Sequence, residues 1–79
     1  MIKCTISSPL ETTAYDNLRG ITLPAVHGQM EILPGHAESF MLLQKGDVIL
    51  HYADSEDKVV KIAGSGACYA KDDAIVIFI

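Results

Sequence analysis

Apolar and polar residues alternate along several short segments of the chain, and a period of two residues is typical of half-buried β-strands. The pattern is clearest near the start, where Ile2, Cys4 and Ile6 alternate with polar residues. The segments that it predicts as strands are 2–7, 10–15, 18–23, 29–33, 37–44, 48–52, 58–63, 67–70 and 74–79. None carries the longer period of an amphipathic helix, so the pattern favours an all-β domain.

Turn-forming residues separate the predicted strands at intervals of about 8–12 residues. Pro9 is expected to end the first strand and Pro24 the third, because proline has no backbone N–H to donate to a sheet. The other turn signals are Asp16-Asn17, Pro34-Gly35, Lys45–Asp47, Asp54–Asp57, Gly64–Gly66 and Lys71–Asp73. This spacing predicts one domain over residues 1–79, a small flattened β-sandwich or partly closed barrel of about 8–10 short strands.

Three of the predicted strands carry particular expectations. In the segment 18–23, alternation predicts that Arg19, Ile21 and Leu23 share one side. Residues 40–43 form a continuous apolar run, which we interpret as a strand. The final segment, 74–79, is also very apolar, so we expect it to lie inside a sheet or under a neighbouring element, because an uncovered apolar strand is an edge open to aggregation.

The composition excludes some classes of partner. Six lysines and arginines stand against ten aspartates and glutamates, which gives a net charge of −4. That balance does not favour nucleic acid or anionic lipid, whose binding depends on basic patches. No apolar run approaches the ~20 residues of a membrane helix, and the N-terminus lacks the apolar stretch of a secretory signal. We therefore expect a cytosolic protein without direct membrane insertion.

The residues that most often perform catalysis are poorly placed for it. Cys4 and Cys68 match no metal or redox spacing, and each falls in a predicted strand, so we expect two buried free thiols. Ser65 lacks the G-x-S-x-G spacing of a nucleophile elbow. The carboxylate pairs Glu56-Asp57 and Asp72-Asp73 lie in polar turns, where solvated side chains are the rule. The sequence predicts no catalytic residue and no enzyme activity.

Prolines, glycines and histidines are concentrated in the segment 21–38, ITLPAVHGQMEILPGHAE. Its metal-ligating residue types are His27, Glu31, His36 and Glu38. A cupin-like β-barrel that binds a metal, as a binding protein or an enzyme, is the alternative interpretation. Cupins usually need a His-x-His pair and a further downstream histidine, whereas here His36 stands alone and no histidine follows His51. We therefore expect no metal and no cofactor.

The same segment carries a resemblance to a specific family. The residues concerned are ITLP at 21–24, Gly28, ILPGHA at 32–37, Leu42 and KGDV at 45–48, together with Ser8-Pro9 and the glycines at 64–66. Over almost its whole length the chain resembles the ε subunit of F-type ATP synthases, and the resemblance implies that subunit's N-terminal β-sandwich. In the family a helical hairpin follows this domain. The sequence given ends at Ile79, so the regulatory functions tied to the hairpin are not carried over from the resemblance.

The resemblance also implies a role. An ε-type β-domain is a non-catalytic part of the central stalk, which belongs to the rotor. It links the γ subunit to the membrane-embedded c-ring of a proton- or sodium-translocating F-type ATP synthase and helps to couple ion flow to ATP synthesis. The expected place is peripheral, at the cytoplasmic face of the energy-transducing membrane.

Three sets of residues are expected to serve this role. The expected contacts to the polar loops of the c-ring are His36 first, then Gln29 and Glu31. Residues expected to shape a rigid loop region at one end of the domain are Pro24, Gly28, Pro34 and Gly35. The apolar candidates for contact with the γ subunit are Met41, Leu43 and Phe78.

Overall fold

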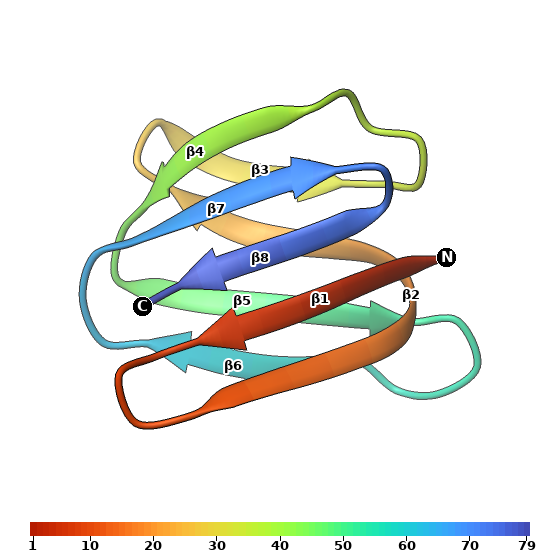
Figure 1. Cartoon of the computed structure of the whole chain (residues 1–79), viewed down its shortest axis with the longest axis horizontal. Coiled ribbons are helices and arrows are strands. Elements are labelled where there is room, and N and C mark those ends of the chain that lie inside the picture. Colours follow the sequence, from red (N-terminus) through yellow and green to blue (C-terminus); the bar gives the residue numbers. More distant parts are fainter.

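The computed structural model describes residues 1–79 and consists of eight β-strands and their connections (Figure 1). The strands are β1 (Ile2–Ser7), β2 (Thr12–Ala25), β3 (Gly28–Ile32), β4 (Ser39–Leu43), β5 (Gly46–Tyr52), β6 (Lys58–Ile62), β7 (Gly66–Lys71) and β8 (Ala74–Phe78). The prediction of an all-β sandwich or partly closed barrel is confirmed. The chain has no helix with the length and apolar character needed to span a bilayer.

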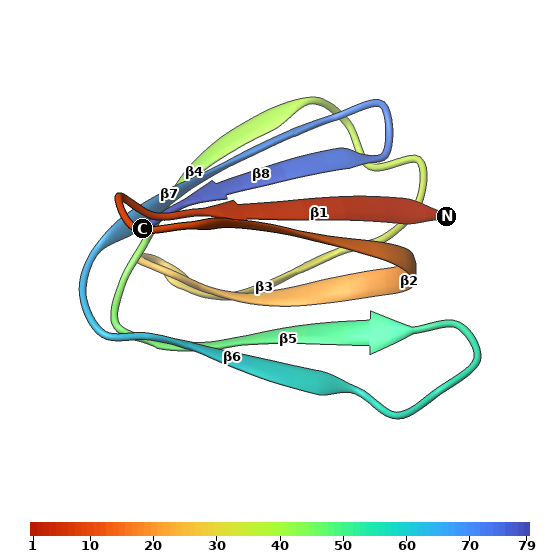
Figure 2. The same ribbon diagram turned by 60° about the horizontal axis from the view of Figure 1, so that its bottom comes forward.

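The strands lie in two layers (Figure 2). One layer contains β4, β7, β8, β1 and the first half of β2, and the other contains β3, the second half of β2, β5 and β6. The 14-residue strand β2 therefore belongs to both layers. Because β4 also meets the end of β2, where Leu43 lies opposite Ala25, the path β1-β8-β7-β4-β2 closes on itself.

Two bulges bend β2 between the layers. Against β1, Asp16 and Asn17 together oppose the single residue Lys3, and Asn17 has a φ of 60°. Against β5, Arg19 is the extra residue between the paired positions Leu18 and Gly20. An extra residue bends a strand and increases its twist, so a single strand can pass from one layer to the other.

These bulges correct two predictions. Asp16-Asn17 is not a turn between strands, because asparagine takes the left-handed conformation in a bulge as readily as in a turn. Arg19 does not share the side of Ile21 and is exposed, since the extra residue shifts the alternation by one. Pro24 does not end the strand either: it lies inside β2, opposite Gln29 of the edge strand β3.

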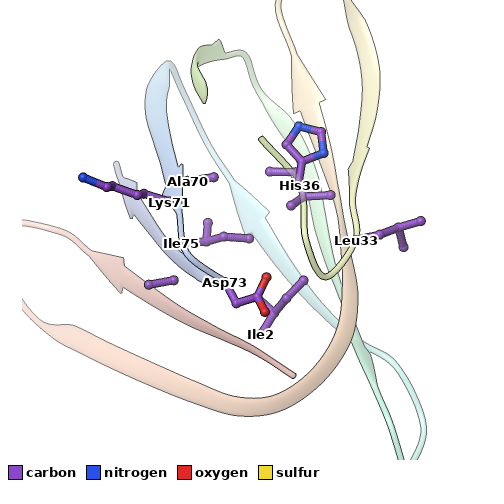
Figure 3. A pocket seen from close by; sticks show the side chains of 9 residues that line it. Ile2, Leu33, His36, Ala70, Lys71, Asp73 and Ile75 are labelled. Carbon is purple, nitrogen blue, oxygen red and sulfur yellow. The ribbon is translucent and has the colours of Figure 1, made fainter. Parts of the chain in front are cut away.

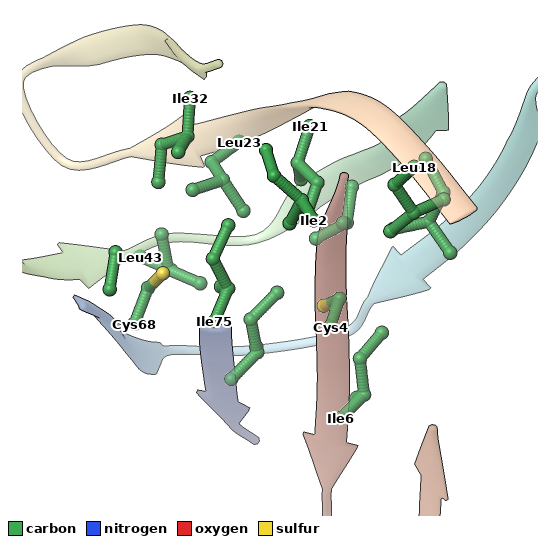
Figure 4. Packing of buried hydrophobic residues seen from close by; sticks show 14 of the residues in the cluster. Ile2, Cys4, Ile6, Leu18, Ile21, Leu23, Ile32, Leu43, Cys68 and Ile75 are labelled. Atoms are coloured by element: carbon green, nitrogen blue, oxygen red, sulfur yellow. The ribbon is translucent and has the colours of Figure 1, made fainter. Parts of the chain in front are cut away.

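The core lies between the two layers and receives buried apolar side chains from all eight strands (Figure 4). Ile2, Cys4 and Ile6 line it from β1, as their alternation predicts. Both thiols are buried and free, which confirms that prediction. Burial raises the pKa of Cys4 to about 12, with a smaller contribution from nearby Cys68, and raises the pKa of Cys68 to about 11.

The last strand, β8, lies inside a sheet as expected. It pairs in parallel with β1 and antiparallel with β7. The turn between β7 and β8 is Asp72-Asp73, whose φ values of 53° and 60° are both left-handed. Aspartate tolerates this conformation, and two such residues are typical of a tight hairpin turn. The predicted turn at Lys71–Asp73 is thus confirmed, and so is that at Pro34-Gly35.

Candidate interaction surfaces

The segment 21–38 does not form one loop region at one end of the domain. His27 lies in the two-residue turn between β2 and β3, whereas His36 lies in the loop between β3 and β4. Figure 1 shows these two connections at opposite ends of the sandwich. The five residues of β3 separate them, a distance of about 16 Å at ~3.3 Å per residue. The prediction of a single end-loop is therefore wrong.

The four residues expected to shape that loop have different surroundings. Gly28 and Gly35 have φ values of 127° and 81°, a conformation that favours glycine. Pro34 precedes Gly35 in the turn after β3. Pro24 lies in a strand instead, and its Cβ is only 2.8 Å from where a Cβ on Gly46 would lie. Pro24 and Gly46 thus fix how closely the ends of β2 and β5 approach.

His36 lies beside a small hollow at one end of the sandwich (Figure 3). The hollow has a volume of about 10 Å³, which is room for at most about one water molecule. The N–H of His36 donates to the carbonyl of Leu33 at 3.1 Å, and the N–H of Gly35 donates to the carboxylate of Asp73 at 2.8 Å. The imidazole is exposed on a turn that the β7–β8 connection holds in place.

The structure brings together no group of three His, Cys, Asp or Glu side chains that could hold a metal ion. His27 and His36 lie at opposite ends of β3 (Figure 1). The geometry therefore offers no support for the cupin-like alternative.

Gln29 and Glu31 lie on an exposed edge of the sandwich. Both are exposed on β3, which pairs with β2 alone. Glu31 lies opposite Thr22, and Gln29 lies opposite Pro24. We call this surface the β3 edge, defined by Gln29, Glu31 and the exposed Leu33 that follows the strand. An edge strand also presents unpaired backbone groups to a partner.

A second surface, which we call the apolar face, is the outer side of β4, β7 and β8. It is defined by Phe40, Leu42, Ala67, Tyr69, Val76 and Phe78. Strand pairing sets Leu42, Ala67 and Phe78 in one row and Phe40, Tyr69 and Val76 in the next. Phe40, Leu42 and Phe78 are 64%, 58% and 52% exposed. A contiguous exposed apolar surface of this kind marks an interaction site.

The apolar face changes the expected contacts with the γ subunit. Phe78 lies on it, but Leu43 is 1% exposed and belongs to the core, so the prediction that Leu43 makes a surface contact is wrong. Met41 points inward and is partly buried against the core. It lines a groove between β3 and β4 that Val26 and Met30 also line.

Phe40 and Leu42 are the exposed residues of β4, and sequence analysis missed them. The run 40–43 is apolar at every position, so it does not indicate which side faces the core. Pairing with β7 decides the side, because Met41 lies opposite the buried Cys68.

The structure also contains a hydrogen-bonded network of Thr22, His51 and Asp57, which the sequence did not predict. His51 Nε2 lies 2.7 Å from Thr22 Oγ1, and Nδ1 lies 2.9 Å from Asp57 Oδ2. These are the residue types of a hydrolase triad, but Thr22 is only 8% exposed. This network joins β2 and β5 to the β5–β6 loop, and the Arg19 guanidinium lies 3.9 Å from the Asp57 carboxylate. We interpret the network as structural.

The rim of the apolar face carries one polar contact. The Tyr69 hydroxyl donates to the carboxylate of Glu38. This hydrogen bond, followed by desolvation, raises the pKa of Tyr69 above its usual value. Tyr69 lies opposite Phe40 across the strands, and both side chains are exposed, so both aromatic rings are available to a partner.

Comparison with known proteins adds a family to this geometry. The family model for the β-sandwich domain of the ATP synthase delta/epsilon chain matches residues 1–79. The ATP synthase epsilon chain of Sulfurovum sp. (strain NBC37-1) is 31% identical over 62 residues, which cover 78% of this chain and 48% of the relative. That of Wolinella succinogenes is 26% identical over 62 residues, which cover 78% and 47%. The chain thus spans about half the length of these relatives.

Solved structures share the fold at lower sequence identity. A chain of the Euglena gracilis mitochondrial ATP synthase, solved with OSCP, F1 and c-ring, matches with a TM-score of 0.88 and 22% identity, over 98% of this chain and 49% of its own length. A chain of the Tetrahymena thermophila mitochondrial ATP synthase central stalk and c-ring matches with a TM-score of 0.74 and 16% identity, over 98% and 61%.

Proposed function

This chain belongs to the ATP synthase delta/epsilon chain family, as its β-sandwich domain, and on that premise we propose that it is a non-catalytic subunit in the central stalk of an F-type ATP synthase. It links the γ subunit to the c-ring and helps to couple the flow of protons or sodium ions to ATP synthesis. It lies peripherally, at the cytoplasmic face of the membrane. The match of the family model to all 79 residues carries the proposal.

The apolar face is the proposed contact with the γ subunit. Of the contact residues expected from the sequence, Phe78 is exposed and is kept as a proposed contact. The exposed Phe40 and Leu42 are proposed in place of Leu43, which is buried. Met41 is kept as a residue at the margin, in the groove beside β4. Covering these exposed side chains removes apolar area from water, which is the main driving force of most association between proteins.

The test is the affinity of the chain for a purified γ subunit, measured by calorimetry. The change Phe78→Ser, in an exposed side chain, is expected to weaken binding at least about tenfold, as truncation of an aromatic anchor does. Val59→Ser is the matched control, because Val59 is similarly exposed, at 51%, on the other layer. A folded chain that does not bind the γ subunit would contradict the proposal.

The β3 edge is the proposed contact with the polar loops of the c-ring, through Gln29 and Glu31. His36 is proposed as a separate contact, because it lies beyond the far end of β3. Polar contacts at the rim of an interface are individually weak, about 0–1 kcal/mol each. The loss of all of these contacts should therefore weaken the coupling of ion flow to ATP synthesis without dissociating the complex.

Two variants separate the contribution of the β3 edge from that of His36. Gln29→Ala with Glu31→Ala removes the polar side chains of the β3 edge, and His36→Ala changes the loop at the other end. We expect the first variant to lower ion-driven ATP synthesis in reconstituted vesicles while ATP hydrolysis by the detached catalytic sector is unchanged. Full synthesis in both variants would exclude these residues as c-ring contacts.

The proposal also requires that the chain performs no chemistry alone. The purified chain should hydrolyse no ATP, and the same assay with Thr22→Val should give an identical result. ATP hydrolysis that is present in the unchanged protein and lost in Thr22→Val would instead assign an activity to the network of Thr22, His51 and Asp57.

A further inference from the structure

The loop that carries His36 is not held in place by burial. All six residues between β3 and β4, Leu33–Glu38, are exposed, so the removal of apolar surface from water contributes little to the conformation of this loop. The His36 imidazole has no hydrogen-bond partner within the chain. The direction of the imidazole therefore depends on what fixes the backbone of the loop.

Two hydrogen bonds fasten the loop to β7 and to the turn that follows it. The N–H of Gly35 donates to Oδ1 of Asp73 at 2.8 Å, and the Tyr69 hydroxyl donates to the carboxylate of Glu38. The first bond is made next to His36 in the chain, whereas the second is made next to the start of β4. Asp73 is therefore the fastening that acts most directly on His36.

Asp73 is itself held on two sides. Its carbonyl accepts a hydrogen bond from the N–H of Lys3 at 3.0 Å, and its left-handed φ of 60° belongs to the tight β7–β8 turn. Figure 3 shows Asp73 beside the turn that leads to His36. A hydrogen bond accepted by a carboxylate is about twice as strong as one between neutral groups. Asp73 thus offers the loop a fixed and strong acceptor.

The β7–β8 hairpin also carries part of the apolar face. Asp73 directly precedes β8, and Phe78 lies at the end of the same strand. The hairpin therefore connects the loop proposed to contact the c-ring with the face proposed to contact the γ subunit. A force applied to His36 reaches β8 through Asp73.

We propose that Asp73 is a positioning residue, which holds His36 in the orientation that meets the polar loops of the c-ring. This inference rests on the proposed function, in which His36 makes that contact. Without the bond to Asp73, the loop samples other conformations, and the apparent affinity falls with the fraction of chains that are ready to bind. The net strength of an ordinary hydrogen bond corresponds to a loss of about three- to tenfold.

The first experiment measures the order of the loop by NMR relaxation of the chain alone. Asp73→Gly permits the left-handed turn but removes the acceptor, so the order parameter of the His36 amide should fall from about 0.85 to below about 0.6. Asp73→Asn should preserve the order, because its amide oxygen accepts the same bond and asparagine tolerates the same φ. Cooperative thermal unfolding verifies that each variant is folded.

Asp72→Gly is the matched control for the change in the turn. Asp72 has a similar φ of 53° in the same turn, but its side chain makes no hydrogen bond within the chain. Its loss should leave the order parameter of His36 unchanged.

The second experiment measures the affinity of the chain, bound to the γ subunit, for a purified c-ring. Asp73→Gly should raise the dissociation constant about three- to tenfold. Asp73→Asn should leave it unchanged, because the position of the loop matters and the charge of the carboxylate does not. In a chain that already carries His36→Ala, Asp73→Gly should cause no further loss, since Asp73 acts through His36.

Several results would overturn the positioning role of Asp73. The loop could stay ordered in Asp73→Gly, or Asp72→Gly could disorder it equally. Asp73→Asn could weaken c-ring binding as much as Asp73→Gly, which would make the charge of Asp73 a direct contact. A further loss of affinity in the His36→Ala chain would show that Asp73 does not act through His36.

A failure of the proposed function gives a different result. If His36→Ala leaves the affinity for the c-ring unchanged, His36 is not a c-ring contact, and the role of Asp73 in that contact is overturned with it. The order parameters are measured without a c-ring, so they distinguish this outcome from a failure of Asp73 to hold the loop.

Discussion

At Gly66, where β7 begins, a methyl group would lie 2.6 Å from the backbone oxygen of Phe78 and 3.1 Å from the side chain of Ile79. Neither β7 nor β8 can move away without disturbing its other pairing partner. We expect Gly66→Ala to destabilise the fold by about 1–3 kcal/mol, the usual cost of overpacking.

Urea unfolding measures this cost, and Gly64→Ala is the matched control. No atom lies within 4 Å of the corresponding methyl position at Gly64. The control should change the stability by no more than about 0.5 kcal/mol. Equal effects of the two changes would show that β7 and β8 are not in close contact at Gly66.

The two buried thiols predict how stability depends on pH. Burial raises the pKa of Cys4 from 9.0 to about 12 and that of Cys68 from 9.0 to about 11. The folded state therefore keeps protons that the unfolded chain releases above pH 9. Stability is full below pH 9 and falls as the pH rises toward 11, by on the order of 1 kcal/mol per pH unit.

Urea unfolding at pH 8 and at pH 10 tests this expectation. The control combines Cys4→Ala with Cys68→Ala, which removes both titrating groups. All three tyrosines are present in both proteins, so the control, which lacks the two buried thiols, should lose less stability between the two pH values. Identical losses of stability in the two proteins would mean that the thiols do not cause the pH dependence.

Among the elements, β2 departs most from what its sequence predicts. Asn17 has a left-handed φ of 60° and is part of the bulge opposite Lys3. A β-branched residue is strained in this conformation, at a cost of about 1–2 kcal/mol. We expect Asn17→Val to destabilise the fold by that amount and Asn17→Gly to be tolerated, as thermal unfolding will measure. A neutral Asn17→Val would mean that the bulge relocates along β2.

Strand positions were largely predictable, whereas the faces and ends of some strands were not. Pro34-Gly35 and Asp72-Asp73 were identified as turns because their preferred backbone conformations suit turns and little else. Asp16-Asn17 was mistaken for a turn because a bulge needs the same conformation. Leu43 was mistaken for a surface residue because the apolar run around it has no polar side, and only pairing with β7 orients it.

The interaction surfaces show the same limit. Gln29 and Glu31 are exposed on β3, as their alternation with Met30 and Ile32 allows. Phe40 and Phe78 come from distant segments and meet on one face only because β7 lies between β4 and β8. No local pattern contains that arrangement, since it depends on which strands are neighbours.

For the whole molecule, β8 completes the layer that carries the apolar face. It lies between β1 and β7 and contributes the buried residues Ile75 and Ile77. Loss of each such side chain costs about 2–5 kcal/mol, against a total stability of about 5–15 kcal/mol for a domain. We expect removal of residues 74–79 to abolish cooperative thermal unfolding.

An insertion in an exposed loop is the control for that truncation. Two residues, Gly-Ser, placed between Ser55 and Glu56 lengthen a connection whose residues are exposed. Lengthening such a loop costs about 0.6 kcal/mol or less, so cooperative unfolding should persist. A truncated chain that still unfolds cooperatively would show that the remaining strands close the layer without β8.

The parallel pairing of β1 with β8 also determines how the domain bears mechanical load. Lys3–Ser7 lie beside Ala74–Phe78, and the N- and C-termini lie at opposite ends of the molecule (Figure 1). A force between the termini therefore acts along both strands and shears their hydrogen bonds together. A force that separates Gly46 from Ile62, paired at the open end of the β5–β6 hairpin, instead breaks the bonds one after another. In single-molecule pulling, we expect the first geometry to require the greater force, so that the domain is stiffest along the line that joins its first strand to its last.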